Sequence, residues 1–174
     1  MNIKITYFEP FGGRSFNASS ATALGLDINA EKIGLPISWN EISHRLDDVL
    51  EDEPDYLFMI GEAGMIPFPR LELEAHNISN GKDNYEVEKH NEKIIEDGLD
   101  TLNTTFIVDD DFVLSYDAGQ YLCNCSYYLA LSKAKNTKVI FIHVPAFNEG
   151  DEENKKESIA TVDSMINRLI ELND

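Results

Sequence analysis

Cysteines are scarce in this sequence, and long apolar runs are absent. Cys123 and Cys125 are the only cysteines among 174 residues, so the chain can build neither a disulfide framework nor a zinc site with four cysteine ligands. No apolar run reaches about eighteen residues, and a membrane span is not expected. The first residues, MNIKITYFEPFGG, lack the basic start and apolar stretch of a signal peptide. We therefore expect a cytoplasmic protein in a reducing compartment.

Basic residues are also few. The sequence has 14 Lys and Arg against 32 Asp and Glu, which gives a formal net charge of −18. Binding of nucleic acid or of an anionic membrane needs clustered Lys and Arg, so neither partner is expected. The negative field should instead favour neutral or basic ligands. Apolar residues make up 43% of the chain, which is enough for a core, and the length suits one domain over residues 1–174.

Short apolar blocks predict a sheet that is buried on both faces. The run Tyr56–Ile60 is fully apolar and Val139–Val144 is strongly apolar, which is typical of strands covered by helices on both sides. Further strands are expected at Asn2–Phe8, Ala30–Leu35, Leu71–Ile78, Thr105–Val108 and Phe112–Ser115.

Helical spacing of apolar residues occurs between these strands. Helices are expected at Ala18–Leu26 (with Asn17 as N-cap), Glu41–Leu50, Tyr121–Lys133 and Ile159–Leu172. The polar stretch Ser79–Asp97 is expected to run over the surface, and Gly150–Lys156 to form a charged turn. Strands that alternate with helices indicate an α/β sandwich with a largely parallel sheet, whose sites gather at the strand ends.

Cys123 lies where a strand gives way to a helix. Gly119 permits a sharp turn, and Cys123 follows in or near the first turn of the helix. Free N–H groups and the helix dipole favour a thiolate there, the reactive form of cysteine. The alternative is a small and inert core residue. Cys125 lies about 200° further around the helix, so only one of the two can face a site.

A cysteine nucleophile needs a base, and the chain has four histidines. His143 lies near the end of an apolar strand, where site residues gather and where a buried imidazole needs a hydrogen-bond partner. A purely structural role is the alternative. His44 and His90 are expected on solvated surfaces. His76 stays a candidate because it adjoins Asn77, near the acidic residues considered next.

A third group should orient the imidazole of the base. By position, the candidates are Asp117, Glu72 and Glu74. Glu72 and Glu74 would share one face of a strand, because the side-chain period of a strand is two residues. Spacing alone leaves the choice among the three carboxylates open.

Four motifs follow one another along the chain. The first is Phe8-Glu-Pro-Phe-Gly-Gly, followed by Asn17, and the second is Gly61-Glu-Ala-Gly, followed by Glu72-x-x-Ala-x-Asn. The third is Asp117-Ala-Gly-Gln-Tyr-Leu-Cys-Asn, and the fourth is Phe141-Ile-His-Val-Pro. In this order they resemble the motifs of the pyroglutamyl peptidase I family of cysteine peptidases, also called pyrrolidone-carboxylate peptidases. The resemblance runs from about residue 3 to about residue 170, with a shortened middle and C-terminal part.

The resemblance implies a three-layer α/β/α sandwich with a mostly parallel, twisted mixed sheet. It implies a cysteine exopeptidase (omega peptidase) that hydrolyses the amide bond after an N-terminal pyroglutamyl residue through a thioester, with no metal and no organic cofactor. Cys123 would be the nucleophile and His143 the base. Glu72 would be the orienting acid, because only Glu72 has the family's spacing to Ala75 and Asn77. Members often form dimers or tetramers, so a homo-oligomer is expected.

The resemblance also implies a substrate pocket. Phe8 and Phe11 match the aromatic residues that flank the lactam ring, and Glu62 stands near the lactam where many members have Gln. An ionised carboxylate cannot donate a hydrogen bond. The Asp-Ala-Arg-Ile-Pro stretch of the family is not recognisable in Asn80–Asn84, although Lys82 stands near the position of its arginine. We therefore expect ring recognition to differ more than the chemistry does.

Two other functions keep the fold and change the site. A cysteine amidase would use the same three residues on another small N-terminal group, with Glu62 and Asn80–Asn84 as the altered contacts. A non-catalytic binding protein derived from the fold would need no activity, since a fold does not imply a function. The presence of Glu72, Cys123 and His143 together argues against the binding protein.

Overall fold

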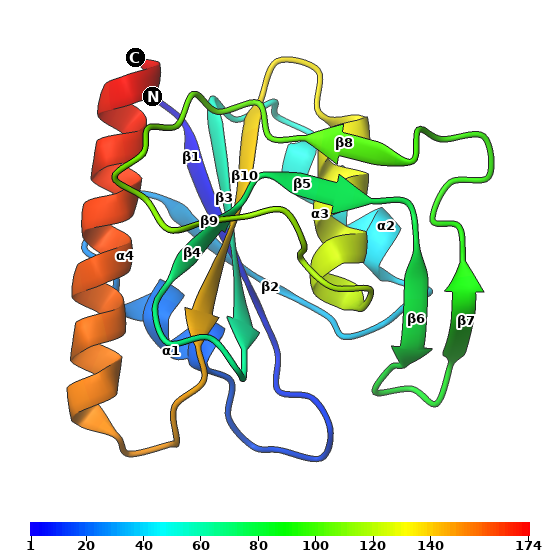
Figure 1. Cartoon of the computed structure of the whole chain (residues 1–174), viewed down its shortest axis with the longest axis horizontal. Coiled ribbons are helices and arrows are strands. Elements are labelled where there is room, and N and C mark those ends of the chain that lie inside the picture. The colour runs from blue at the N-terminus through cyan, green and yellow to red at the C-terminus, as the bar shows by residue number, and fades with distance from the viewer.

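A computed structural model describes all 174 residues and has a six-stranded sheet at its centre (Figure 1). The strand order is β2 (Glu31–Leu35), β1 (Ile3–Phe8), β3 (Tyr56–Ala63), β10 (Lys138–Pro145), β4 (Arg70–Glu72) and β9 (Leu114–Ser115). The first four strands are mutually parallel, β4 runs antiparallel to β10, and β9 is parallel to β4. The predicted mixed and mostly parallel sheet is thus confirmed.

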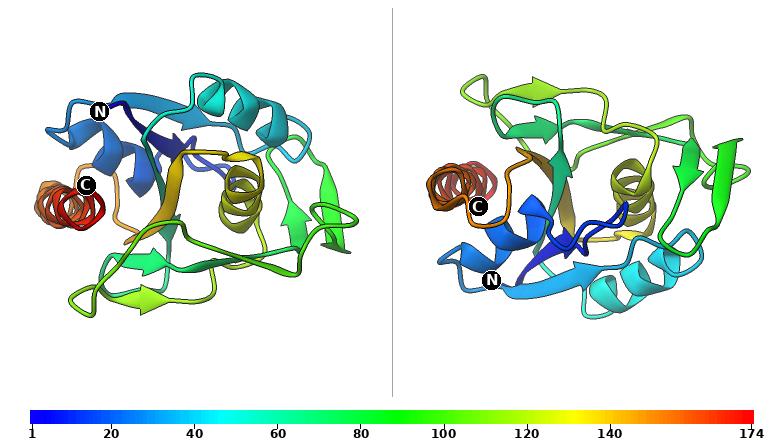
Figure 2. Two further views of the ribbon diagram at one scale, coloured as in Figure 1. Left: turned by 90° about the horizontal axis from the view of Figure 1, so that it is seen from above. Right: turned by 90° about the horizontal axis from the view of Figure 1, so that it is seen from below.

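Four helices cover the sheet in two layers (Figure 2). On one side lie α1 (Ala18–Gly25) and α4 (Glu152–Asn173), and on the other lie α2 (Ile42–Leu50) and α3 (Leu122–Lys133). Each layer packs its own apolar cluster against the sheet. None of these helices combines the length and the apolar character that crossing a bilayer would require. The three-layer sandwich follows from strands that must bury apolar side chains on both faces.

The two central strands explain where a site can form. In β3 and β10 the predicted apolar runs are buried, and both strands extend beyond the runs to their C-terminal ends. Near these ends, His143 of β10 pairs in register with Gly61 of β3. Polar groups therefore emerge side by side at one edge of the sheet, which is the usual place for a site in parallel α/β folds.

The predicted strand Leu71–Ile78 is wrong as a single element. It splits at Leu73 into β4 and β5 (Glu74–His76), and β5 pairs with β8 (Thr101–Asn103) in a separate two-stranded sheet. The backbone of Leu73 donates to Ser115 and accepts from Thr104, so its two hydrogen bonds go to different neighbours. Glu72 and Glu74 consequently do not share a face of one strand.

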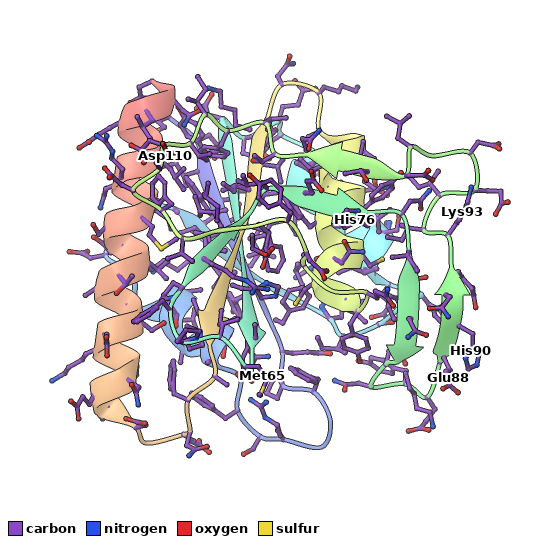
Figure 3. The ribbon with its side chains drawn as sticks, viewed as in Figure 1. Met65, His76, Glu88, His90, Lys93 and Asp110 are labelled. Atoms are coloured by element: carbon purple, nitrogen blue, oxygen red, sulfur yellow. The ribbon has the colours of Figure 1, made fainter.

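Other boundaries also differ from expectation. Residues Thr105–Val108 form no strand, and of Phe112–Ser115 only the last two residues pair. The excursion Ser79–Asp97 contains a hairpin of β6 (Ser79–Lys82) and β7 (Glu88–Glu92), and Figure 3 shows Glu88 and His90 on β7 at the far edge of the molecule from α4.

The last helix also begins earlier than expected, within the predicted charged turn Gly150–Lys156. Asp151 caps α4 by accepting a hydrogen bond from the backbone N–H of Asn154. Glu152 and Glu153 occupy the first turn of the helix, where carboxylates interact favourably with the positive end of the helix dipole.

Candidate active site

The predicted site residues meet around one cavity of about 350 Å³ at the C-terminal ends of β3 and β10. Phe8, Phe11, Glu62, Cys123 and His143 all line this cavity, although they come from four different parts of the chain. Glu72 is completely buried directly behind His143. The structure therefore brings these six residues together.

Cys123 is the second residue of α3, and its sulfur lies against β3. A Cβ atom built on Gly61 would lie 2.9 Å from Cys123 Sγ and 2.6 Å from the ring of Phe141. Only a glycine leaves room for the sulfur at this point of the strand. Gly119, with a φ of +83°, makes the turn that leads into the helix, as the sequence predicts.

The backbone N–H at the start of the helix lowers the pKa of the Cys123 thiol, as expected, but opposing influences outweigh it. Burial, followed by the negative charges of Glu72 and Glu62, raises the pKa of the Cys123 thiol to about 12. Desolvation and like charge disfavour the anion more strongly than the free N–H groups of the helix favour it. Cys123 is therefore a neutral thiol until a base removes its proton.

His143 and Glu72 form a hydrogen-bonded pair. Nδ1 of His143 lies 2.7 Å from Oε1 of Glu72, and both side chains are buried. Burial alone would raise the pKa of Glu72, but its hydrogen bonds, chiefly the one with His143, lower this pKa below the ordinary value. A carboxylate in this place holds the imidazole with Nδ1 as the donor, which leaves Nε2 free to accept a proton.

Arg70 is a site residue that the sequence analysis missed. Its Nε donates to Oε1 of Glu72 at 2.7 Å, and its Nη2 donates to the backbone carbonyl of Asp117 at 3.2 Å, in the loop before α3. Arg70 also lines the cavity. The signal for it was present, because Arg70 precedes Glu72 by two residues and so faces the same side of β4.

The other candidate acids point elsewhere. Oδ1 of Asp117 accepts a hydrogen bond from the backbone N–H of Gly119 at 2.8 Å and so supports the turn before α3. Glu74 is half-exposed, and its carboxylate lies 3.6 Å from Nε2 of His76. Among the three carboxylates, only Glu72 contacts His143.

The other histidines are also outside the site. His76 uses one ring nitrogen toward Thr101 and the other toward the carbonyl of Tyr116, and Figure 3 shows it near β5 and α3. His44 lies on α2, away from the catalytic cavity. His90 is exposed on β7. These positions support His143 as the base.

Aromatic side chains form the walls of the cavity. Phe8 packs against Phe141 beneath it, with ring centroids 6.4 Å apart, and Phe11 contacts Tyr121 at 6.2 Å. Burial is the first cause that raises the pKa of Tyr121 to about 12, so its hydroxyl is neutral and donates to the carbonyl of Lys82 at 2.7 Å. The cavity thus offers a slot whose size and apolar walls suit a small ring.

Glu62 lines this slot, but its carboxylate is already engaged. Arg14 donates to Oε1 at 2.6 Å from Nη1 and to Oε2 at 2.9 Å from Nη2. The backbone N–H of Ala18, at the start of α1, donates to Oε2 at 2.7 Å. The ammonium group of Lys82 pairs with Glu86 at the surface and does not line the cavity.

Comparisons with known proteins point to one family. A sequence model of the family described as pyroglutamyl peptidase matches residues 1–169. Pyrrolidone-carboxylate peptidase of Thermococcus kodakarensis is 30% identical to the chain over 184 residues, which cover 92% of this chain and 88% of that protein. Pyroglutamyl-peptidase 1 of Rattus norvegicus is 26% identical over 164 residues, which cover 82% and 78% of the two chains.

Solved structures show the same arrangement of the backbone. Pyrrolidone carboxyl peptidase from Thermococcus litoralis matches with a TM-score of 0.77 at 28% identity, over 99% of this chain and 97% of that one. A mutant of pyrrolidone carboxyl peptidase from Pyrococcus furiosus has a TM-score of 0.85 at 24% identity, over 98% and 99%. The second match concerns the fold alone.

Proposed function

The chain belongs to the pyroglutamyl peptidase family, and we propose that it removes the N-terminal pyroglutamyl residue of peptides with Cys123 as nucleophile, His143 as base and Glu72 as orienting acid. It is a cysteine peptidase of the pyroglutamyl-peptidase I type. The observation that carries the proposal is the contact of 2.7 Å between His143 and Glu72, at the wall of the cavity that also holds Cys123.

The reaction is an acyl transfer in two steps. His143 removes the proton of the Cys123 thiol as the sulfur attacks the pyroglutamyl carbonyl carbon, and the C–S bond forms. The tetrahedral species then expels the amine of the next residue, which takes a proton from the imidazolium of His143. Water, deprotonated by His143, attacks the thioester and releases pyroglutamate, and the thiol regains its proton. Glu72 stabilises the imidazolium in both steps.

The resting protonation states fit this sequence of steps. The pKa of the Cys123 thiol is raised to about 12, so the thiol is protonated at rest and needs a base to become a nucleophile. The hydrogen-bonded carboxylate at Nδ1 stabilises the positive charge that develops on the imidazole of His143. The pair of Glu72 and His143 therefore takes up the proton that the Cys123 thiol loses.

The start of α3 offers donors for the oxyanion. Tyr121, at the N-cap of this helix, makes no side-chain hydrogen bond to the first turn. The first N–H groups of a helix have no partner within the helix, and those of Leu122 and Cys123 lie beside the cavity. We assign them to the developing oxyanion, where donors of this kind stabilise a transition state.

Release of a fluorogenic amine from pyroglutamyl, prolyl and alanyl conjugates tests the function. We expect turnover of the pyroglutamyl conjugate alone, and loss of that turnover in Cys123→Ser. Cys125→Ser is the matched control, because Cys125 faces the core rather than the cavity, and it should keep the activity if it folds. Turnover that survives in Cys123→Ser would contradict the assignment of the nucleophile.

We also propose that the enzyme works in the cytosol as a homo-oligomer, a dimer or a tetramer. Both cysteines are free thiols, and a cysteine nucleophile needs a compartment that keeps it reduced. Several large apolar side chains are exposed, among them Met65 at 97%, and exposed apolar groups of this kind are common at subunit contacts. Light scattering of the purified chain would reveal the assembly, and a monomeric mass at micromolar concentration would contradict it.

A further inference from the structure

Two buried carboxylates lie at the cavity, Glu62 in its wall and Glu72 behind His143, and each has its own arginine. The side chain of Glu62 is 2% exposed and that of Glu72 is 0% exposed. Arg14 pairs with Glu62 at 2.6 Å, and Arg70 pairs with Glu72 at 2.7 Å. Both carboxylates lie close enough to Cys123 to disfavour its thiolate. The two arginines therefore balance the negative charge of the pocket.

The two ion pairs have different roles. Glu72 also contacts His143 and is part of the proposed catalytic machinery. Glu62 contacts no other ionisable side chain, because its two oxygens are occupied by Arg14 and by the backbone N–H of Ala18. A pair of this fork-to-fork geometry is strong and directional, and the hydrogen bond to Glu62 raises the pKa of Arg14 further.

Arg14 lies at the edge of the slot, where it can be changed without disturbing the core. Its side chain is 42% exposed, and its guanidinium carbon lies 5.3 Å from the centre of the Phe11 ring. Nη2 also donates to the carbonyl of Phe16, within the same loop. The arginine covers both the aromatic wall and the carboxylate behind it.

A pyroglutamyl group and an N-terminal prolyl group are similar in shape but should differ in affinity for this pocket. The ring nitrogen of a pyroglutamyl group is a neutral lactam N–H, whereas that of an N-terminal prolyl group is a protonated amine near neutral pH. Transfer of a charged amine into an apolar slot is costly unless an opposite charge is free to pair with it. With Glu62 held by Arg14, no such charge is available from Glu62.

We propose that Arg14 is a specificity-determining residue, which neutralises Glu62 and thereby makes the pocket select a neutral lactam over the charged ring amine of an N-terminal proline. This inference rests on the proposed function and adds the means by which the ring is chosen. Arg70 does not replace Arg14 in this task, because its guanidinium is bound to Glu72.

The test compares kcat/KM for the pyroglutamyl and prolyl conjugates at pH 6.5, where the prolyl amine is protonated. In Arg14→Met the uncompensated Glu62 should lower the ratio of the two constants by about tenfold or more, because it can now pair with the amine. The double variant Arg14→Met with Glu62→Gln should restore the ratio, since the charge is gone. Arg14→Lys should give an intermediate ratio, because its ammonium keeps the positive charge but cannot reproduce the bidentate pairing.

Arg168→Met is the matched control, because Arg168 pairs with Asp109 on α4's outer side and is absent from the cavity lining. It should leave the ratio unchanged. If Arg14→Met lowers both constants equally, or if the double variant fails to restore the ratio, Arg14 has only a structural role and the inference is overturned.

A binding measurement separates this inference from the proposed function. A wild-type chain that turns over no pyroglutamyl conjugate would refute the function, and calorimetry with Cys123→Ala would then decide the inference. L-pyroglutamide and L-prolinamide are the probes. Addition of Arg14→Met to Cys123→Ala should shift the ratio of their Kd values toward prolinamide by about tenfold, and an unchanged ratio would overturn the inference.

Discussion

Arg70 donates a hydrogen bond from Nε to Oε1 of Glu72 at 2.7 Å. The same oxygen contacts Nδ1 of His143 at 2.7 Å, while Oε2 is buried without a hydrogen-bond partner. A single oxygen atom of Glu72 therefore connects the guanidinium to the imidazole. A change at Arg70 should reach His143 through this carboxylate, although the two side chains are not hydrogen-bonded to each other.

Arg70→Met should lower kcat by about tenfold to a hundredfold, because a hydrogen bond to a charged group is worth about 1.5–3 kcal/mol. Loss of the guanidinium hydrogen bond should also raise the pKa of the Glu72 carboxyl, which Arg70 helps to hold below its ordinary value, so the acidic limb of the pH–rate profile should move to higher pH. Steady-state kinetics across pH 5–9 would measure both effects. Arg70→Lys should recover part of kcat, and Arg45→Met on α2 should behave as the wild type. An unchanged profile in Arg70→Met would refute the positioning role.

Gly61→Ala should reduce activity strongly. The added Cβ would lie 2.9 Å from Cys123 Sγ and 2.6 Å from the Phe141 ring, so the nucleophile or the strand must shift. Overpacking of this kind costs about 1–3 kcal/mol of stability, which thermal unfolding would detect. Gly64→Ala is the matched control, because nothing lies within 4 Å of a Cβ at that position. Equal activity of the two variants would show that Sγ has room to move.

Alkylation of Cys123 by iodoacetamide should be slow near pH 7 and should accelerate with pH. Burial and the nearby carboxylates raise the pKa of this thiol to about 12, so the thiolate fraction rises about tenfold per pH unit below that value. Mass spectrometry of the modified peptide gives the rate, and Cys123→Ser gives the background from Cys125. A rate that is already maximal at pH 7 would show that the free enzyme holds a thiolate.

Stability should fall on the alkaline side, and Cys125 should contribute to the fall. Burial raises the pKa of the Cys125 thiol from 9.0 to about 12 in the folded chain. The unfolded chain therefore loses this proton first, so the contribution of Cys125 is complete below about pH 9 and is lost as the pH rises toward 12. Urea unfolding from pH 7 to pH 11 would measure the slope.

The slope should be shallower in Cys125→Ala, although this variant starts from a lower stability because a buried group has been removed. Ser132→Ala, at an exposed position of the same helix without an ionisable group, should keep the slope of the wild type. Equal slopes in all three proteins would contradict the proposed origin.

The local pattern of apolar and polar residues was sufficient to predict much of the fold. The runs Tyr56–Ile60 and Val139–Val144 form the two central strands, because apolar β-formers of that length are stable only when covered on both faces. The N-cap role of Asn17 is also confirmed by its hydrogen bond from the N–H of Ser19. These features depend on residues that are close in sequence.

The local pattern did not predict the strand break at Leu73 or the absence of a strand at Thr105–Val108. Leu73 bonds to Ser115 and to Thr104 through its backbone, and Thr105 contacts the backbone of Val139 through its own N–H and its hydroxyl. Such partners are chosen by tertiary contacts. A pattern of apolar residues cannot show which neighbour will take each backbone hydrogen bond.

By itself the sequence determined the residue types of the site and their order: Glu72, then Cys123, then His143. Only the tertiary structure decided which charged groups surround these residues. It paired Arg14 with Glu62 across 48 residues, placed Arg70 on Glu72, and buried the thiol beside both carboxylates. The reason is that the residue type fixes which functional group a side chain carries, whereas its pKa and its partners depend on distance and desolvation in three dimensions.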